Sequence, residues 1–412
     1  MRLWLVFIAF LFSPWSLSAG PLETGEPESL GFSQERLAQL KARMQGHVDS
    51  GRLNGLSTAV IRDGQIVHLS THGYQDRESV KPLSRQAIFR IYSMTKAVTA
   101  VAAMMLYEKG HFQLLDPIET YLPEFKQTQV FLGGTVDRPQ LVAPRKPITI
   151  RDLFLHTACF SYPFTQHPVD RMYDKVKLFN GQRNSAQFVS AVAKLPLKCQ
   201  PGSQYSYGVS TDVLGRIIEL VSGLSLDEYM AKYIFEPLGM VDTGFYVPKA
   251  DHARFMTLYI RQKNGTLEPA DPELTNAFLT QPKMAMGGGG LVSTVDDYLK
   301  FLQMLLNGGQ LNGVRLLSPK TVDFMFTDHL SPKLRVAPGY GKGFGFAILR
   351  RISGHRRLGV IGEAGWSGIA NTFFWIDRSS NTAFMGWTQM FPWGAPKFRF
   401  EIPQMVYGAM TR

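Results

Sequence analysis

Cysteine and charge are both scarce in this chain. Its 412 residues include only two cysteines, and charged residues make up 19% of the sequence against 45% that are hydrophobic. The cysteines match no metal-binding spacing, and the nine histidines form neither an H-E-x-x-H motif nor another cluster of ligands. A chain of this composition has enough apolar surface to fold, which excludes a disordered protein. We therefore expect a globular protein without a metal site.

Long apolar runs are missing after the N-terminus. Residues 3–12 are apolar, follow the basic Arg2 and precede the small residues 16–20, a pattern typical of a signal peptide. The run is short for a membrane span. We expect cleavage near Ala19 and an exported, water-soluble protein, periplasmic or secreted, with no stable membrane insertion after cleavage. The alternative is an uncleaved membrane anchor.

Basic clusters are missing as well, although the formal net charge is +11. Lysine and arginine are scattered, and no basic run with interleaved aromatic residues occurs. This distribution is typical of a solvated surface, so we expect no nucleic-acid partner.

What the chain does contain is a buried helix with a serine at its start. Residues 88–110 run from an apolar segment into Ser93-Met94-Thr95-Lys96 and then into a stretch that is apolar on nearly all sides. Because positions i and i+3 share a helical face, Ser93 and Lys96 are expected to be in contact. A buried lysine is costly, and backbone N–H groups at a helix start can stabilise an oxyanion. The motif therefore predicts a serine nucleophile beside a group that handles its proton.

The rest of the pattern predicts strands at both chain ends and helices between them. Residues 33–50 predict a helix, and residues 56–71 predict a hairpin around Asp63-Gly64. Further helices are predicted at residues 149–156, 185–194, 209–221, 225–235 and 294–306, after Ser318-Pro319, and at 402–410. Further strands are predicted at residues 344–350, 357–361, 369–376 and 382–389. Residues 249–283 read as a loop with a turn at Asn264-Gly265.

This order indicates an α/β (α+β) fold with two domains after a signal peptide of residues 1–19. Residues 20–110 and 285–412 are expected to build one sheet domain, with residues 111–284 as a mainly helical inserted domain. The run Gly287–Gly290 is not followed by the Lys-Ser/Thr of a phosphate loop, so close backbone packing is preferred there.

Three stretches also carry a resemblance to a known family. They are Ser93-Met94-Thr95-Lys96, then residues 201–215 with Tyr205-Ser206-Tyr207-Gly208-Val209, then Gly362-Glu363-Ala364-Gly365-Trp366-Ser367-Gly368. In this order they resemble motifs of the serine β-lactamase and penicillin-recognising family, especially class C β-lactamases and the carboxylesterases on the same fold. The second stretch stands where the family has Tyr-x-Asn, and the third where it has Lys-Thr-Gly. The resemblance implies a β-lactamase-like fold, an antiparallel sheet flanked by helices with an inserted helical domain.

The resemblance also implies roles for single residues. Ser93 would be the acylated nucleophile, Lys96 its proton partner and Tyr207 would share the base role. Tyr205 is the competing assignment for the tyrosine, and Tyr207 is preferred from its spacing to residues 212–215. The oxyanion hole would consist of the backbone N–H groups of Ser93 and Trp366.

The chain departs from the family pattern in the substrate-binding stretches, which hold Val209, Glu363, Ala364 and Gly365. Val209 replaces the asparagine amide that would bind the side-chain amide of a β-lactam. Glu363 replaces a lysine suited to a carboxylate with an anion that would repel one, unless a nearby arginine compensates. Both changes weaken the case for β-lactam or peptidoglycan substrates and resemble the esterase branch. The G-x-S-x-G elbow of α/β-hydrolases is absent.

The leading hypothesis is an exported serine hydrolase that cleaves small carboxylic esters through an acyl-enzyme, with no metal or organic cofactor. Its partner would be a small-molecule ester or amide substrate. A β-lactamase or D-amino-acid-specific peptidase and a non-catalytic binding protein on the same fold are the alternatives, since fold alone cannot choose among them.

Cys159 and Cys199 both flank the expected site. Cys159 stands where the family's His-Thr-Ser-Gly stretch would carry glycine, and Cys199 lies just before Pro201-Gly202. In an exported protein this placement leaves two outcomes open, a disulfide or two separate buried thiols.

Overall fold

A nine-stranded sheet forms the frame of the protein. The computed structural model describes residues 22–353, 357–394 and 397–412. Eight strands follow one another across the sheet, and a ninth, β4 (Lys81–Pro82), pairs with β3. In spatial order the eight are β1 (Glu23–Thr24), β3 (Gln65–Asp76), β2 (Gly55–Arg62), β17 (Thr382–Trp387), β16 (Phe373–Asp377), β15 (Ala364–Ser367), β14 (Ala347–Leu349) and β13 (Tyr340–Lys342). All these pairs are antiparallel except β1 with β3.

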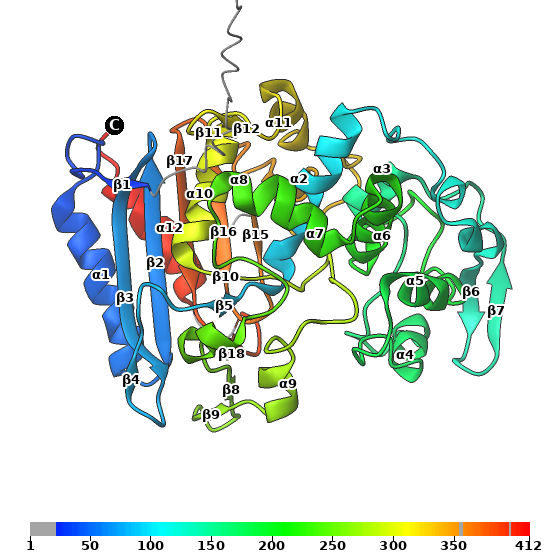
Figure 1. Cartoon of the computed structure of the whole chain (residues 1–412), viewed down its shortest axis with the longest axis horizontal. Coiled ribbons are helices and arrows are strands. Elements are labelled where there is room, and N and C mark those ends of the chain that lie inside the picture. Colours follow the sequence, from blue (N-terminus) through cyan, green and yellow to red (C-terminus); the bar gives the residue numbers. More distant parts are fainter. Residues whose placement is uncertain (1–21, 354–356, 395–396) are drawn as a thin grey trace, which may run out of the picture.

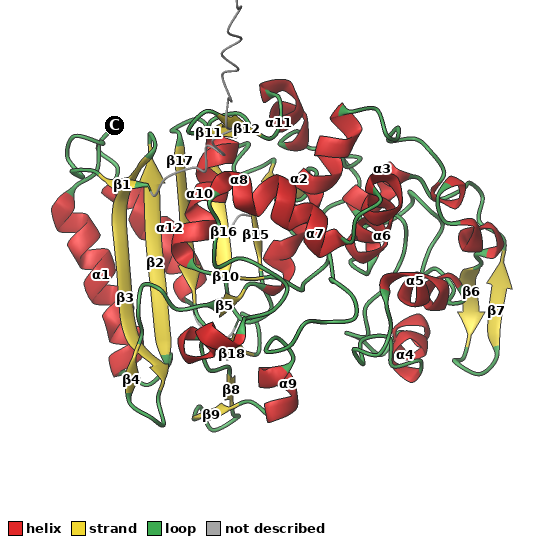
Figure 2. Cartoon of the chain, in the orientation of Figure 1, coloured by secondary structure: helices red, strands yellow, loops and turns green. Residues whose placement is uncertain are grey.

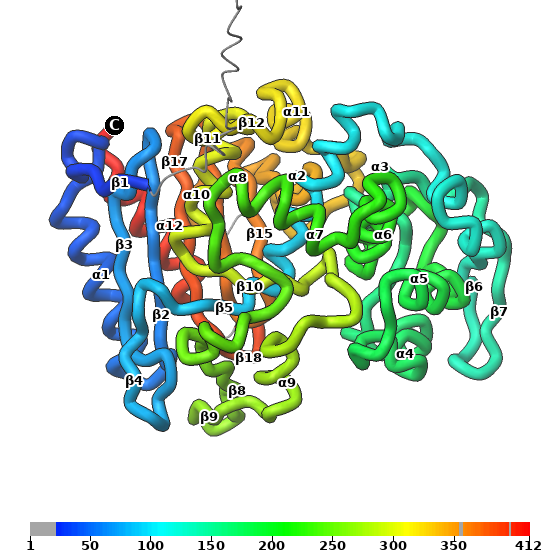
Figure 3. Tube along the Cα trace, viewed as in Figure 1, coloured from blue at the N-terminus to red at the C-terminus, as the bar shows by residue number. Residues whose placement is uncertain are grey.

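The sheet joins the two ends of the described chain. β2 and β3 form the predicted hairpin around Asp63-Gly64, and β2 pairs with β17, with Arg62 opposite Thr382. The first and last helices, α1 (Gln34–Asp49) and α12 (Phe398–Ala409), also lie together, blue beside red in Figure 3. Sequence segments far apart therefore make one structural unit.

Helices cover both faces of this sheet. Successive strand residues point to opposite faces, so Phe384 packs in the core under α1 and α12, while Met385 packs in the core on the other face. That second face carries α2 (Thr95–Glu108) and α10 (Val295–Leu306) (Figure 1). The apolar surface of α2 on nearly all sides is explained by this position, because its other side packs against helices of the middle of the chain.

The middle of the chain lies beyond α2 and is mostly helical (Figure 2). Its helices are α3 (Ile150–Leu155), α4 (Pro168–Lys175), α5 (Ser185–Ala193), α6 (Ser210–Ser222), α7 (Leu226–Met230) and α8 (Glu236–Leu238). A small sheet of β6 (Val130–Gly134) and β7 (Pro139–Val142) lies at its outer end. Thr149 caps α3 in a reciprocal pair with Asp152, as its T-x-x-D pattern indicates. Asn184 and Ser225 cap α5 and α7 in the same way.

The segment predicted as a loop holds short elements. A hairpin of β8 (Tyr259–Arg261) and β9 (Leu267–Pro269) turns at Asn264-Gly265, and α9 (Pro272–Asn276) follows. β8 also pairs with β18 (Met390–Phe391), which comes from the C-terminal part of the chain. The remaining elements are β5 (Phe89–Arg90), β10 (Val292–Ser293), β11 (Gln310–Leu311), β12 (Val314–Arg315) and α11 (Pro319–Met325).

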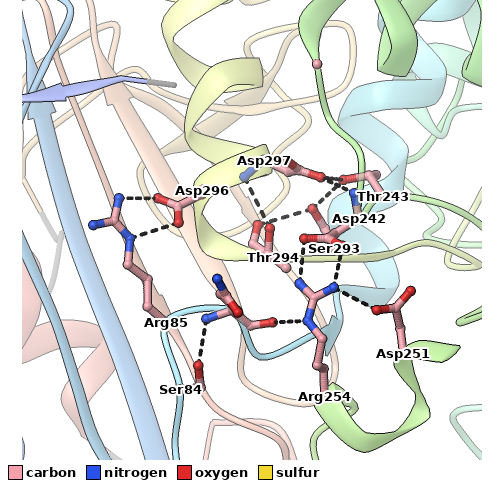
Figure 4. A network of polar contacts seen from close by, with 12 residues as sticks. Ser84, Arg85, Asp242, Thr243, Asp251, Arg254, Ser293, Thr294, Asp296 and Asp297 are labelled. Atoms are coloured by element: carbon pink, nitrogen blue, oxygen red, sulfur yellow. Dashed lines mark hydrogen bonds and ion pairs between the residues drawn. The ribbon is translucent and has the colours of Figure 1, made fainter. Parts of the chain in front are cut away.

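A polar network fixes the start of α10 to two distant segments (Figure 4). Arg85 binds both carboxylate oxygens of Asp296 at 2.7 and 2.8 Å. Arg254 binds both oxygens of Asp242 at 2.6 and 2.7 Å and also reaches Asp251. Asp297 accepts the backbone N–H of Asp242. The network holds residues 242–254 against the helix.

Two predicted elements differ from the structure, and two short strands were not predicted. No strand forms at residues 357–361, while β13 and β15 were not predicted because they are only three and four residues long. The helix expected to begin at Ser93 begins at Thr95, after a 3-10 turn of Tyr92–Met94. The predicted signal peptide, residues 1–19, lies outside the described residues.

Candidate active site

Ser93, Lys96 and Tyr207 meet at the start of α2. The Ser93 Oγ accepts hydrogen bonds from the Tyr207 hydroxyl at 2.8 Å and from Lys96 Nζ at 3.2 Å. The Lys96 ammonium also lies 4.8 Å from the centre of the Tyr207 ring. The spacing of Ser93 and Lys96 predicts the first contact, whereas Tyr207 arrives from the loop before α6.

The nucleophile sits on a tight turn. Tyr92, the residue before Ser93, has φ of 42°, in the left-handed region that non-glycine residues rarely occupy. Gly368, just after β15, lies against this turn, and a Cβ there would stand 2.5 Å from the carbonyl oxygen of Ile91. The lack of a side chain at Gly368 therefore lets the end of β15 approach the serine.

The glycine run supports Lys96 rather than a phosphate. Lys96 Nζ donates to the Gly288 carbonyl, and the Gly288 N–H donates to Asp212 Oδ1 at 2.8 Å. A Cβ on Gly288 would lie 2.5 Å from Asp212 Oδ2, and one on Gly287 would lie 2.8 Å from the carbonyl oxygen of Thr211. The predicted close backbone packing at this run is confirmed.

Buried groups around Ser93, Lys96 and Tyr207 control the electrostatics of these three residues. Asp212 is fully buried at the start of α6, and burial raises the pKa of its carboxyl, while the Lys96 charge and the Gly288 N–H oppose that rise. Tyr162 donates to Asp212 Oδ2 at 3.3 Å, and burial followed by the Asp212 charge raises the pKa of Tyr162 well above its ordinary value. Lys96 and the Gly288 N–H therefore favour the ionised form of Asp212, whereas burial opposes it.

His156 packs under the tyrosine loop. Its ring centre lies 5.0 Å from that of Tyr207 and 6.0 Å from that of Tyr205. Burial, and then the charges of Lys342 and Lys96, lower the pKa of His156 well below its ordinary value, so the imidazole is neutral. Its carbonyl accepts the Ser206 N–H at 2.8 Å, which holds the loop between the two tyrosines.

A disulfide fixes the same loop. Cys159 and Cys199 are bonded, with Cα atoms 5.3 Å apart, so the first of the two outcomes is confirmed. The Ser206 hydroxyl donates to the Phe160 carbonyl at 2.8 Å, and Gly208 packs against the same peptide, where a Cβ would lie 2.5 Å from Phe160 C. The loop that carries Tyr207 is thus held at several points against residues 156–160.

Ser93 opens into a cavity of about 1140 Å³ with a largely aromatic wall. This exceeds the volume of a typical drug-sized pocket, roughly 300 to 1,000 Å³. Tyr205, Tyr207, Gly365 and Trp366 line it together with Ser93. Further aromatic lining residues are Tyr92, Tyr162, Phe164, Phe179, Phe188, Phe245, Phe278, Tyr340, Trp375, Trp393 and Phe400. The cavity therefore suits a predominantly apolar ligand.

Three residues expected to bind substrate do not line this cavity. Val209 is fully buried at the start of α6, and Ala364 is buried in the core under α2. Glu363 is buried and its carboxylate pairs with Arg357 and accepts the Tyr407 hydroxyl at 2.8 Å. Arg357 is thus the nearby arginine that compensates the charge of Glu363, the condition under which Glu363 would not repel a substrate carboxylate.

The oxyanion donors remain a prediction. Ser93 and Trp366 both line the cavity. The Trp366 ring centre lies 5.9 Å from that of Tyr207, which bonds to Ser93. The pairing of β14 with β15 ends at Gly365, which faces Ala347, so β14 does not pair with Trp366. The backbone next to Trp366 is therefore open on the β14 side.

Sequence reasoning missed Asp212, His156 and Lys342 as members of the site. Asp212 and His156 lie in stretches that the motifs already marked, but a single sequence gives no sign that their side chains face Lys96. Lys342 lies in β13, which was itself not predicted. Within the described ranges, no group of three or more histidine, cysteine, aspartate or glutamate side chains could hold a metal ion.

Comparison with known proteins places this arrangement in a family. The family model described as Beta-lactamase matches residues 40–399. The chain belongs to the Beta-lactamase family. The predicted β-lactamase-like fold is confirmed by this match and by the solved structures that resemble it.

Several relatives of this Beta-lactamase family chain have been described. Protein Rv1367c of Mycobacterium tuberculosis is 34% identical over 347 residues, which cover 81% of this chain and 85% of the relative. Lovastatin esterase of Penicillium rubens is 29% identical, covering 83% and 90%. The solved structure of EstCE1, a hydrolase with promiscuous acyltransferase activity, is 27% identical with a TM-score of 0.79, covering 92% of this chain and 99% of that chain.

Proposed function

We propose that this protein hydrolyses carboxylic esters through an acyl-enzyme on Ser93. The observation that carries the proposal is the pair of hydrogen bonds that Tyr207 and Lys96 make to Ser93 Oγ at the wall of the cavity. The names of relatives such as lovastatin esterase support the same reaction class.

The reaction follows from these contacts. In this structure the Tyr207 hydroxyl donates to Ser93 Oγ, so Tyr207 must first release its proton to solvent; the Ser93 proton then passes to the Tyr207 oxygen as Oγ bonds to the ester carbonyl carbon. The C–O bond to the alcohol then breaks, and the proton returns from Tyr207 to the leaving alkoxide. A water molecule attacks the acyl-enzyme by the same route, releases the acid and restores Ser93. Lys96 stabilises the negative charge on Tyr207, since its ammonium lies beside the ring.

The active-site serine can be tested directly. The Ser93→Ala variant should lose turnover of p-nitrophenyl butyrate and labelling by a serine-reactive phosphonate, as measured by intact-mass spectrometry, while its circular dichroism spectrum is unchanged. A matched control is Ser203→Ala, an exposed serine in the same motif stretch as Tyr207. Ester turnover by Ser93→Ala at the rate of the unchanged protein would contradict the proposal.

Ester should be preferred over β-lactam. Val209 is buried outside the cavity lining and offers no amide to a β-lactam side chain, and the lack of one such hydrogen bond costs about 1 to 3 kcal/mol, roughly ten- to hundredfold in rate. The comparison is kcat/KM for p-nitrophenyl acetate or butyrate against nitrocefin. A preference for nitrocefin would instead favour the β-lactamase alternative.

We also propose that the protein acts outside the cytoplasm. The apolar N-terminal pattern and the Cys159–Cys199 disulfide support this location, because disulfides persist in oxidising compartments. N-terminal sequencing of the protein recovered from the medium or periplasm should find a chain that begins near residue 20.

A further inference from the structure

Lys342 is a second buried lysine near the catalytic serine. It ends β13, is only 1% exposed, and its ammonium donates to the Phe346 carbonyl at 3.3 Å. The carboxylate closest in sequence, Asp328, accepts the backbone N–H of Lys342 at 2.9 Å and pairs with Arg350. Within the described part of the chain, no carboxylate forms an ion pair with Lys342.

The surroundings of the Lys342 side chain are basic and aromatic. The ammonium lies 4.5 Å from the centre of the Trp366 ring. The Lys96 charge from α2 lowers the pKa of Lys342, and the Lys342 charge in turn lowers the pKa of His156 at the end of α3. A buried ammonium without a counter-ion is costly, so the placement of Lys96 at the Tyr207 ring and of Lys342 at the Trp366 ring, both rings that line the cavity, points to a use for the charge.

Trp366 connects Lys342 to the reacting groups. Its ring contacts the Tyr207 ring with centres 5.9 Å apart, and it lines the cavity beside Ser93, whereas Lys342 does not. Lys342 therefore cannot touch a substrate directly. The Lys342 ammonium acts on Tyr207 through the Trp366 indole, which contacts both residues.

We propose that Lys342 is a positioning residue whose ammonium holds the Trp366 indole against Tyr207 and adds a second positive charge behind the catalytic serine. This inference rests on the proposed acyl-enzyme function. The charge stabilises the Tyr207 phenolate and the oxyanion that forms as Ser93 attacks, and both are more negative than the bound substrate. The effect therefore falls on kcat rather than on KM.

The charge should be lost near neutral pH. Burial, and then the Lys96 charge, lower the pKa of Lys342 to about 7. Lys342 is then protonated below this pH and neutral above it, so its assistance is present on the acid side and disappears as the pH rises. An arginine at this position would keep its charge over the whole range.

The test measures kcat and KM for p-nitrophenyl butyrate from pH 5.5 to 9 in the unchanged protein, Lys342→Met and Lys342→Arg. The Met variant should lower kcat at pH 6 about ten- to fiftyfold, with KM changed less than about threefold. The Arg variant should keep kcat within about threefold and lose the decline in kcat that the unchanged protein shows above pH 7. Lys109→Met is the matched control, since Lys109 is exposed and lies over the Tyr233 ring away from the site.

The outcomes separate this inference from the proposed function. If the unchanged protein is neither active nor labelled at Ser93, the proposed function fails. If it is active and Lys342→Met keeps its kcat and pH profile, or Lys342→Arg falls as far as Lys342→Met, the role of Lys342 is overturned. Should Lys342→Met not fold, the Arg variant decides, because an unchanged decline above pH 7 would overturn the role by itself.

Discussion

Tyr205 and Tyr207 are two residues apart but have different surroundings. The Tyr207 hydroxyl bonds to Ser93, whereas the Tyr205 ring packs at the edge of His156. Burial, and then the Tyr207 charge, raise the pKa of Tyr205 well above its ordinary value, so Tyr205 stays neutral.

We therefore expect Tyr207→Phe to lower kcat for p-nitrophenyl butyrate by several orders of magnitude, since the groups act as one proton-transfer unit. Tyr205→Phe, the matched control, should lower kcat about tenfold or less, because it removes a hydroxyl from the cavity wall and no contact to Ser93. Steady-state kinetics on both variants decides. A larger loss in Tyr205→Phe than in Tyr207→Phe would reverse the assignment.

Single residues also show where sequence reasoning ends. Ser93 and Lys96 could be paired from their spacing, because a helix fixes the geometry of i and i+3. The hydrogen bond from Tyr407 to Glu363 could not be predicted in this way, since Tyr407 comes from α12, 44 residues later. The sequence shows the buried acid but not the distant hydroxyl that bonds to it.

At the level of elements, helices were easier to predict than strands. Capping patterns mark the starts of α3, α7 and α10, where Thr149, Ser225 and Thr294 are the N-cap residues. Three- and four-residue strands such as β13 and β15 have too few residues to show an alternation. They are ordered by their neighbours in the sheet rather than by their own pattern.

The network at the start of α10 should contribute to stability. Arg254 is about a quarter exposed and bonds to both Asp242 and Asp251, so Arg254→Met leaves two carboxylates without their partner. We expect its free energy of unfolding to fall by about 1 to 3 kcal/mol. Urea denaturation measures this change.

The control is the pair Lys175 and Asp137, whose side chains are 68% and 79% exposed. Solvent screens such a pair, so Lys175→Met should leave the free energy of unfolding almost unchanged. Equal losses of unfolding free energy in the two variants would show that the network around Arg254 stabilises the protein no more than an exposed ion pair does.

At the level of the whole molecule, the half-buried His68 should make the fold sensitive to acid. Burial, and then the charges of His72 and Lys41, lower the pKa of His68 to about 4. Its Nε2 is bonded to Thr58 Oγ1 at 2.9 Å, and the network continues to Ser70.

Because the unfolded chain binds this proton near pH 6.5 and the folded protein only near pH 4, stability is full above pH 6.5 and is lost as the pH falls between these values. The free energy of unfolding, measured in urea, should decrease from pH 7 to pH 4.5 in the unchanged protein. In His68→Gln this decrease should be smaller by about 1 to 3 kcal/mol. His111→Gln, an exposed histidine, is the control. An equal fall in all three proteins would remove His68 as a source of acid sensitivity.

The fold class and the use of both chain ends in one sheet were predictable because hydrophobic pattern and motif order cover most of the chain. The large cavity was not, because its wall combines residues of the 3-10 turn before α2, the loop before α6, β15 and the start of α12. Such a surface exists only after long-range packing. The boundaries at residues 110 and 284 stay predictions, and β8 pairs with β18 across the second of them.

The pairing of β2 with β17 has a consequence for how the chain is made. The two strands meet in the middle of the sheet, and the Thr388 hydroxyl bonds to the Gly55 carbonyl from 333 residues away. During synthesis the hairpin of β2 and β3 emerges first and has no partner on its open edge until almost the whole protein has left the ribosome. Contacts of such long range fold slowly, and exposed strand edges attract other chains. Aggregation of nascent chains, rather than instability of the finished protein, is therefore the step that should limit the yield of this fold.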